Sequence, residues 1–127
     1  MNCLNLNLSD EKSIYLQIGE SVENDILRGI LLEEERVPST NEMARAYSIN
    51  PATAAKGINL LVEQGILYKK RGIGMFVAAG SKQKIIQKRK DSFFETYVRS
   101  LVDEARTLAI GKEELMAMIE QAAADKT

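Results

Sequence analysis

The stretch of residues 38–77 constrains the fold more than any other, because its start and stop signals divide it into short, recognisable elements. Ser39 and Glu42 have the spacing of a capping box, in which the serine side chain accepts from the third helical amide and the glutamate reaches back. Asn50 is a strong N-cap residue, and Pro51 suits a first helical position because its missing N–H costs nothing there. The stretch therefore predicts two short helices joined by a turn.

The second of these helices has two different faces. Gly65 is placed to end it. At helical spacing, Ala54, Ile58, Leu61 and Val62 share an apolar face, while Ala52, Lys56, Asn59 and Glu63 share the opposite one. Because the exposed residues near its start are small or polar, this end of the helix can enter a major groove, and the helix dipole favours a nearby phosphate.

A basic hairpin follows the second helix. Residues 66–70 and 75–77 are predicted strands, and Gly72 and Gly74 permit the sharp turn between them. An earlier helix over residues 13–28, with an apolar stripe and Gly29 at its end, is predicted to brace the pair. The stripe consists of Ile14, Ile18, Val22 and Ile26. The fold class is thus mostly α with a small β-hairpin, as in a winged helix-turn-helix.

Four motifs at matching intervals resemble one family, and they cover roughly residues 13–78. They are Ser13-Ile14-Tyr15-Leu16-Gln17-Ile18, Val37-Pro38-Ser39, Asn50-Pro51-Ala52-Thr53 and Lys70-Arg71-Gly72-Ile73-Gly74-Met75-Phe76-Val77. The sequence resembles the N-terminal DNA-binding domain of the GntR family of bacterial transcription regulators, and its Asn-Pro-x-Thr motif and short tail resemble the YtrA-like subfamily. The resemblance implies a winged helix-turn-helix domain over residues 9–78 and a two-helix dimerisation tail over residues 81–124.

The DNA-reading residues depart from the family pattern. Many GntR relatives have arginine where this chain has Asn41, Pro51 and Ala55, and in the family those arginines touch DNA. Their absence removes the side chains best suited to bidentate contact with guanine, each worth about 1–3 kcal/mol of discrimination. Base reading must therefore depend on fewer groups.

The remaining candidates lie at the helix start and on the hairpin. We expect Asn50, Ala52 and Thr53 to meet bases or the adjoining backbone, and Lys56 to reach a phosphate or a base edge. The resemblance implies that Arg71 and the backbone of Gly72 enter the minor groove, where a narrow groove attracts arginine. The predicted DNA-binding residues are Ser39, Asn50, Ala52, Thr53, Lys56, Lys70, Arg71 and Gly72. For Ala52 and Thr53, ordinary filling of a first helical turn is the open alternative.

Charge is unevenly distributed along a chain whose net charge is only −1. Residues 1–65 carry ten acids and five bases, residues 66–90 carry eight bases and no acid, and residues 91–127 carry eight acids and four bases. A purely cationic block that begins on the hairpin is typical of a nucleic-acid interface. A solvated basic helix face is the alternative for residues 82–90, and the acidic loop at residues 33–36 is expected to be solvated surface facing away from DNA.

The tail is predicted to be a helical hairpin. It consists of a long helix over residues 82–108, a break at residues 109–111 and a second helix over residues 112–123. Both helices have apolar residues three and four positions apart. Two such helices cannot bury this broad stripe alone, so a second copy of the chain is the expected cover, with folding back onto the winged helix as the alternative. The predicted dimerisation residues are Phe94, Tyr97, Val98, Leu101, Val102, Leu108, Leu115 and Ile119.

Composition excludes several kinds of chemistry. Histidine is absent and Cys3 is the one cysteine among 127 residues, so disulfides, Cys/His metal clusters and histidine-based catalysis are excluded. No cofactor or metal is expected. No apolar run has transmembrane length and no signal peptide is evident, which predicts a cytoplasmic protein. Residues 1–8 are either a short edge strand or a leader.

We therefore expect a homodimeric, sequence-specific repressor acting on an inverted-repeat operator in double-stranded DNA. Three alternatives are a protein-binding winged helix, a non-specific DNA binder, and an enzyme of the kind fused to an aminotransferase-like domain, against which the short chain and missing cofactor lysine motif argue. A small apolar effector between the tail and the winged helix, near Tyr97, Arg99 or Met118, is a further hypothesis, with packing residues and a surface arginine as its alternative. The operator, the effector, the regulated genes, the choice between repression and activation, and the role of Cys3 are not encoded in any recognisable pattern.

Overall fold

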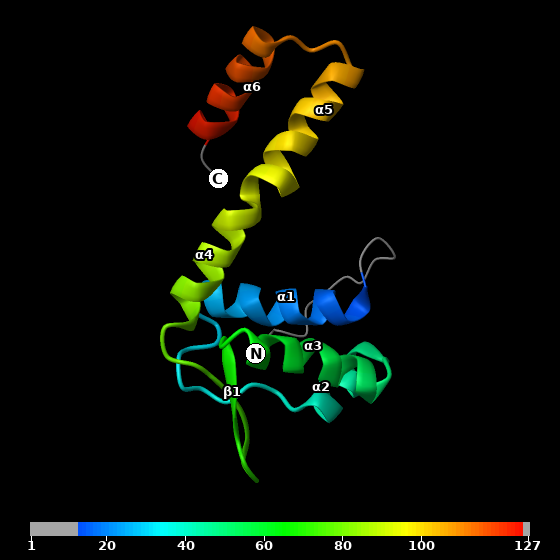
Figure 1. Ribbon diagram of the computed structural model, residues 1–127, viewed down its shortest axis with the longest axis vertical. Helices are drawn as coiled ribbons and strands as arrows, with labels where there is room; N and C mark the ends of the chain where they lie inside the picture. The colour runs from blue at the N-terminus through cyan, green and yellow to red at the C-terminus, as the bar shows by residue number, and fades with distance from the viewer. Residues whose placement is uncertain (1–12, 126–127) are drawn as a thin grey trace. The chain divides into compact units, whose positions relative to one another are not determined.

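The computed structural model describes residues 13–125, which form a mostly helical chain with one hairpin (Figure 1). Two compact units divide the chain between Gln87 and Lys88. Residues 1–8, predicted to be either a short edge strand or a leader, lie with Cys3 outside the described residues. The elements in order are α1 (Ile14–Leu27), α2 (Thr40–Tyr47), α3 (Pro51–Glu63), β1 (Leu67–Lys70), β2 (Gly74–Val77), α4 (Ser81–Phe93), the π-helical segment η1 (Phe94–Val98), α5 (Arg99–Thr107) and α6 (Lys112–Ala124).

The core of the first unit forms where α1, α2, α3 and the hairpin meet. Three of the four predicted stripe residues of α1 are buried, whereas Ile14 is partly exposed at the helix start. Gly57 lets α3 approach α1 closely, because a Cβ there would lie 2.5 Å from the carbonyl oxygen of Tyr15. The buried hydrophobic cluster consists of Ile18, Val22, Ile26, Leu31, Val37, Met43, Ala44, Ala54, Ile58, Leu61, Ile66, Leu67, Val77 and Ile85.

The helix-turn-helix signals in the sequence are confirmed. The Ser39 side chain accepts from the backbone N–H of Glu42, and the Ser39 N–H donates to the Glu42 carboxylate. Ser48 ends α2 in the left-handed region with φ 55°. Asn50 caps α3 by accepting from the backbone N–H of Ala52 at 2.7 Å. These caps fix where α3 begins and therefore which residues its first turn exposes.

The hairpin is antiparallel, and residues 34–37 pair with its second strand. Leu67 lies opposite Val77 and Lys70 lies opposite Gly74. The N–H of Glu34 donates to the carbonyl of Val77 at 2.7 Å, and the N–H of Val37 donates to the carbonyl of Met75 at 2.9 Å. The expectation of a solvated loop here was incomplete. Residues 34–36 are exposed, but the segment also pairs with β2 as a third, strand-like edge of the hairpin, and Val37 is buried.

The long helix after the hairpin contains a segment that the sequence analysis did not predict. Its first turns belong to the winged unit, where Ser81 and Ile85 are both 0% exposed. The backbone stays helical from Ser81 to Thr107, because the residues on either side of η1, Phe93 and Arg99, have helical dihedral angles. Within this helix, the five residues of η1 adopt π-helical hydrogen bonding. The predicted break at residues 109–111 is confirmed, and Ala109 there has φ 58°.

Candidate nucleic-acid interface

The start of α3 presents the side chains that the sequence singled out. Ala52 and Lys56 are exposed and Thr53 is half-buried. The Asn50 side-chain oxygen is occupied by capping, so the amide NH2 group remains as its free donor. The Lys56 ammonium lies 4.2 Å from the ring centroid of Tyr15, a cation–π contact that holds it on the α1 side of the helix. A phosphate contact by Lys56 would have to start from this position.

The two lysines of β1 point to opposite faces of the hairpin. On one face, Tyr68 and Phe76 stack with centroids 5.9 Å apart, and the Lys70 ammonium lies 4.5 Å from the Phe76 ring. Lys69 is on the other face, which it shares with the buried Leu67. It therefore faces the helices.

Lys69 belongs to a shallow depression that connects the hairpin with the start of α2. Arg36, Val37, Ser39, Thr40, Lys69, Gly74 and Met75 line this depression. The predicted DNA-binding residues include Lys70 and not Lys69, and this assignment stays a prediction. Strand alternation was the available signal, because a residue two positions from the inward-facing Leu67 must share its face.

Two carboxylates of the winged unit each accept a hydrogen bond that shifts a pKa. The Ser39 backbone N–H, together with its hydroxyl, lowers the pKa of the Glu42 carboxyl, which is therefore ionised at neutral pH. The Tyr68 hydroxyl donates to Glu34, which raises the pKa of Tyr68 and keeps the phenol neutral. The negative charge of Glu42 would repel any anion bound beside Ser39. The positive charges of the nearby Lys69 and Arg36 would be needed to offset this repulsion.

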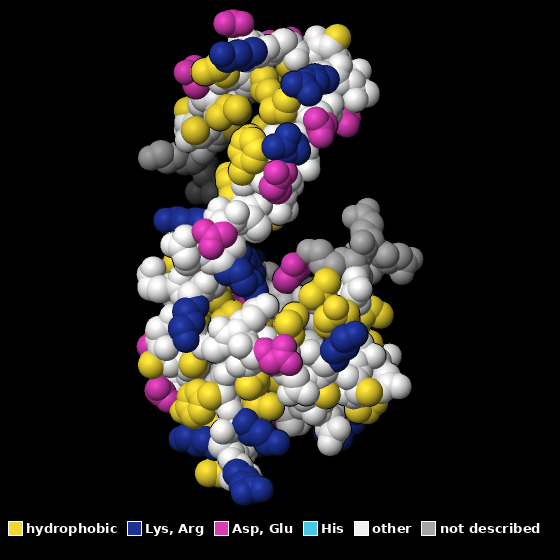
Figure 2. Space-filling view, in the orientation of Figure 1, with side chains coloured by type: hydrophobic (Ala, Val, Ile, Leu, Met, Phe, Trp, Pro, Cys, Tyr) yellow, Lys and Arg dark blue, Asp and Glu magenta, His cyan; other side chains and the backbone are white. Residues whose placement is uncertain are grey.

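The cationic side chains of the hairpin are exposed. Lys69, Lys70, Arg71 and Gly72 are all accessible, and Figure 2 shows Lys and Arg side chains gathered around the hairpin. A type II-like turn, closed by the Ile73 N–H donating to the Lys70 carbonyl at 2.9 Å, places Gly72 at φ 77°. Arg71 is thus carried at the tip of a defined turn.

The tail unit exposes much of its apolar surface. Tyr97 is 63% exposed and Phe94 is 54% exposed, and Figure 2 shows hydrophobic side chains spread over both α5 and α6. Among the described residues beyond Gln87, only Ala105 is buried; Val98, Val102 and Leu115 are half-buried. The residues that we call the tail apolar surface are Phe93, Phe94, Tyr97, Leu101, Leu108, Met116, Met118 and Ile119.

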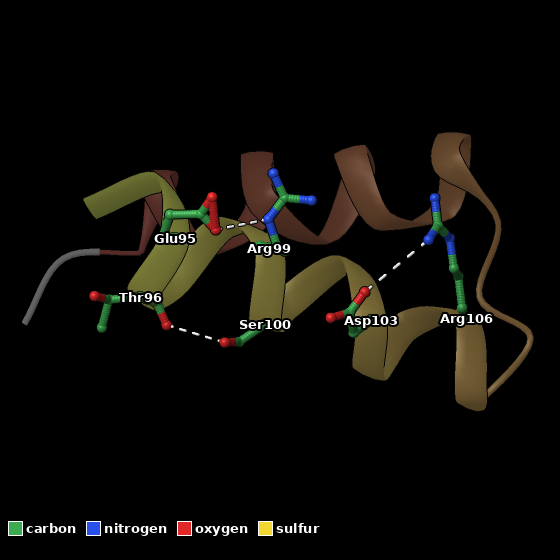
Figure 3. Close-up of polar contacts among 6 residues, drawn as sticks. All are labelled: Glu95, Thr96, Arg99, Ser100, Asp103 and Arg106. Carbon is green, nitrogen blue, oxygen red and sulfur yellow. Dashed lines mark hydrogen bonds and ion pairs between the residues drawn. The ribbon is translucent and has the colours of Figure 1, made fainter. Parts of the chain in front are cut away.

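A polar row also lines η1 and α5 (Figure 3). Arg99 pairs with Glu95 at 2.7 Å and lies 5.0 Å from the Phe94 ring, so its guanidinium is already engaged. Ser100 donates to the carbonyl of Thr96 at 3.1 Å. Because these contacts occupy Arg99, an effector near it would have to compete with Glu95, and the effector hypothesis stays a prediction.

Within residues 13–125, no three or more His, Cys, Asp or Glu side chains are grouped so that they could hold a metal ion, and no helix is long and apolar enough to cross a membrane. The first unit combines three helices, an exposed start of α3 and a cationic hairpin. These features define the class as a winged helix-turn-helix protein.

Comparison with known proteins identifies the family. The model of bacterial regulatory proteins of the gntR family matches residues 14–77. The HTH-type transcriptional regulator YhcF of Bacillus subtilis (strain 168) is 31% identical over 105 residues, which cover 83% of this chain and 85% of YhcF. The HTH-type transcriptional repressor YtrA of the same organism is 27% identical over 112 residues, which cover 88% of this chain and 85% of YtrA. The chain belongs to the gntR family, as the sequence motifs predicted.

Solved structures agree with this assignment. A GntR-family transcriptional regulator from Bacteroides thetaiotaomicron superposes with a TM-score of 0.67 at 38% identity, covering 87% of this chain and 96% of that one. The DNA-binding domain of AraR, solved with operator ORX1, has a TM-score of 0.51 at 31% identity, covering 57% of this chain and 93% of that one. The family and its relatives are transcription regulators, which confirms that the chain is not an enzyme.

Proposed function

We propose that the chain is a cytoplasmic, homodimeric repressor that binds an inverted-repeat operator, with α3 in the major groove and the hairpin tip in the adjoining minor groove. The observation that carries this proposal is the charge distribution: residues 66–90 hold eight bases and no acid, and they begin on an exposed hairpin whose Lys69 shares a depression with Ser39 at the capped start of α2. Cations on a protruding element next to a helix N-terminus suit the phosphates on both sides of a groove. The 31% identical AraR DNA-binding domain was solved in complex with an operator, which supports operator DNA as the partner of this chain.

The predicted site residues divide into base-reading and backbone-holding groups. Ala52 offers a methyl group, Thr53 a hydroxyl and Asn50 a free amide donor, so these three are proposed to meet bases or the adjoining sugar-phosphate chain. Ser39 and Lys69 line the same depression, and a phosphate held there by the Lys69 ammonium is proposed to contact Ser39 at the start of α2.

A second copy of the chain is the proposed cover for the tail apolar surface. Large exposed apolar groups on a unit of this size are typical of an interaction surface. Pairing of two identical surfaces produces a two-fold axis, and that axis requires half-sites related by an inverted repeat. Half-site centres about 10 base pairs apart, or a multiple of that, are expected. The two domains are proposed to be residues 9–78 for DNA binding and residues 81–124 for dimerisation.

Salt dependence of DNA binding tests the proposal. We assume four phosphate contacts in each protomer, made by Lys56, by Lys69 or Lys70, by Arg71 and by one lysine or arginine of residues 82–90. The dimer then releases about eight counterions, and the slope of log affinity against log salt is about −7. Arg71→Ala should reduce the magnitude of this slope by about 2, because two phosphate contacts are lost per dimer. Arg106→Ala, an exposed cation of the tail polar row, should leave it unchanged.

Two results would contradict the proposal. A slope close to zero would remove the nucleic-acid function and favour a protein-binding winged helix. A specificity ratio below about 10³ between a selected and a random duplex would favour a non-specific DNA binder instead. Both can be measured by fluorescence anisotropy with duplexes enriched from a random library.

A further inference from the structure

The hairpin tip carries an apolar side chain in the middle of its cationic surface. Ile73 is 58% exposed and follows Lys70, Arg71 and Gly72 directly. It takes no part in the buried cluster that holds the winged unit together. Folding of the unit therefore does not explain why this position is a large hydrophobic residue.

The backbone around Ile73 is fixed on both sides. Its own N–H closes the turn on the Lys70 carbonyl, and Gly72 and Gly74 both have positive φ, at 77° and 139°. A side chain at position 74 would also clash with a neighbour, because a Cβ there would lie 2.9 Å from the side-chain nitrogen Nε of Arg36. Arg36 pairs with Phe76 of β2, and its side chain lies beside Gly74. The isoleucine is thus carried at a defined place beside Arg71.

We infer that Ile73 is a specificity-determining residue that packs on the floor of the minor groove and disfavours a G·C pair there. This inference rests on the proposed function, in which the hairpin tip enters that groove. An A·T pair presents only acceptors in the minor groove, whereas a G·C pair adds the protruding 2-amino group of guanine. A branched hydrocarbon cannot accept from that amino group and would leave it buried without a partner.

Ile73 and Arg71 would then read two different properties of the same groove. Arginine responds to the negative potential of a narrow groove and contributes to the salt slope. Isoleucine carries no charge, so its contribution should depend on the amino group and hardly on salt. This separation makes the role of Ile73 measurable apart from general DNA binding.

The test adds or removes the minor-groove amino group without changing the major groove base edges read there. In a selected duplex, 2,6-diaminopurine replaces adenine at each A·T pair in turn, symmetrically in both half-sites, and the affinity of the full chain is measured by anisotropy. At the base pair that the hairpin tip contacts in each half-site, the added amino group should weaken binding by the wild type about tenfold or more. An inosine·cytosine pair at that position, which keeps the major-groove edge of G·C but lacks the amino group, should bind about tenfold more tightly than G·C.

Ile73→Ala should lose most of this penalty while keeping the wild-type salt slope. Leu32→Ala, another strongly exposed hydrophobic residue of the winged unit, should keep the full penalty. An unchanged penalty in Ile73→Ala, or no position in the wild-type scan that is sensitive to the amino group, would overturn this inference alone. Failure of the wild type to bind any selected duplex would overturn the proposed function and this inference with it.

Discussion

The two units of the chain treat their apolar residues in opposite ways. The winged unit buries fourteen hydrophobic residues in one cluster, whereas Ala105 is the one buried hydrophobic residue among the described residues beyond Gln87. The tail nevertheless has long helices with a regular apolar pattern. This difference is the reason for the proposal that a second copy of the chain covers the tail, whereas the winged unit buries its apolar residues within one chain.

The largest predicted effect comes from placing a charge on the tail apolar surface. Leu101→Asp should convert the dimer to a monomer, because a carboxylate would be buried at the paired surface. Operator affinity should fall about 10²-fold or more, since the two half-sites are no longer bound by one linked pair. Sedimentation equilibrium gives the mass, and anisotropy gives the affinity.

The neighbouring residue provides the matched control for this substitution. Ser100 is exposed in the polar row, and Ser100→Asp should remain dimeric. A dimer in Leu101→Asp, or a wild-type protein that is monomeric because the tail folds back on its own winged helix, would show that a second copy does not cover the tail.

A smaller effect is expected where the winged unit is packed most closely. Gly57→Ala would place a methyl group 2.5 Å from the Tyr15 carbonyl oxygen, so α1 and α3 must move apart. We expect a loss of about 1–3 kcal/mol in the free energy of unfolding. Urea unfolding followed by circular dichroism measures it.

Gly19 offers a control on the other side of the same helix contact. A Cβ at Gly19 would have its nearest neighbour, the Gly57 carbonyl oxygen, at an ordinary 3.6 Å. Gly19→Ala should therefore be neutral or stabilising by up to about 1 kcal/mol, because alanine favours a helix over glycine. Equal destabilisation by the two variants would contradict this account of the helix contact.

The smallest predicted effect is a pH dependence at the start of α2. The folded-state pKa of Glu42 lies below its ordinary value of 4.5 because Ser39 donates to the carboxylate. The capping contribution is therefore complete above the unfolded pKa and is lost as the pH falls through the lowered folded value. Glu42→Gln should lack this part of the acid destabilisation, which pH-dependent unfolding curves would reveal as a flatter slope below pH 4.5.

The local parts of the fold were predictable because their signals are local. The capping box at Ser39 and Glu42, the Asn50 cap and the two faces of α3 each depend on residues within a few positions of one another. The third edge at residues 34–37 could not be predicted in this way. Its pairing partner on β2 lies some forty residues further along the chain, and its acidic composition resembles that of a loop.

The tail shows a second limit of sequence patterns. Apolar residues three and four apart predicted one long helix, yet η1 widens five residues of it to π geometry. The spacing of the pattern also did not distinguish the half-buried Val98 and Val102 from the exposed Phe94 and Tyr97. That distinction depends on tertiary packing within the tail unit, which no local signal specifies.

Selection from a random duplex library tests the central claim most directly, namely that two chains present two winged units to one operator. The account predicts enrichment of an inverted repeat whose half-site centres are about 10 base pairs apart or a multiple of that, bound by two chains. Enrichment of a single half-site bound by one chain, or of no sequence at all, would contradict it.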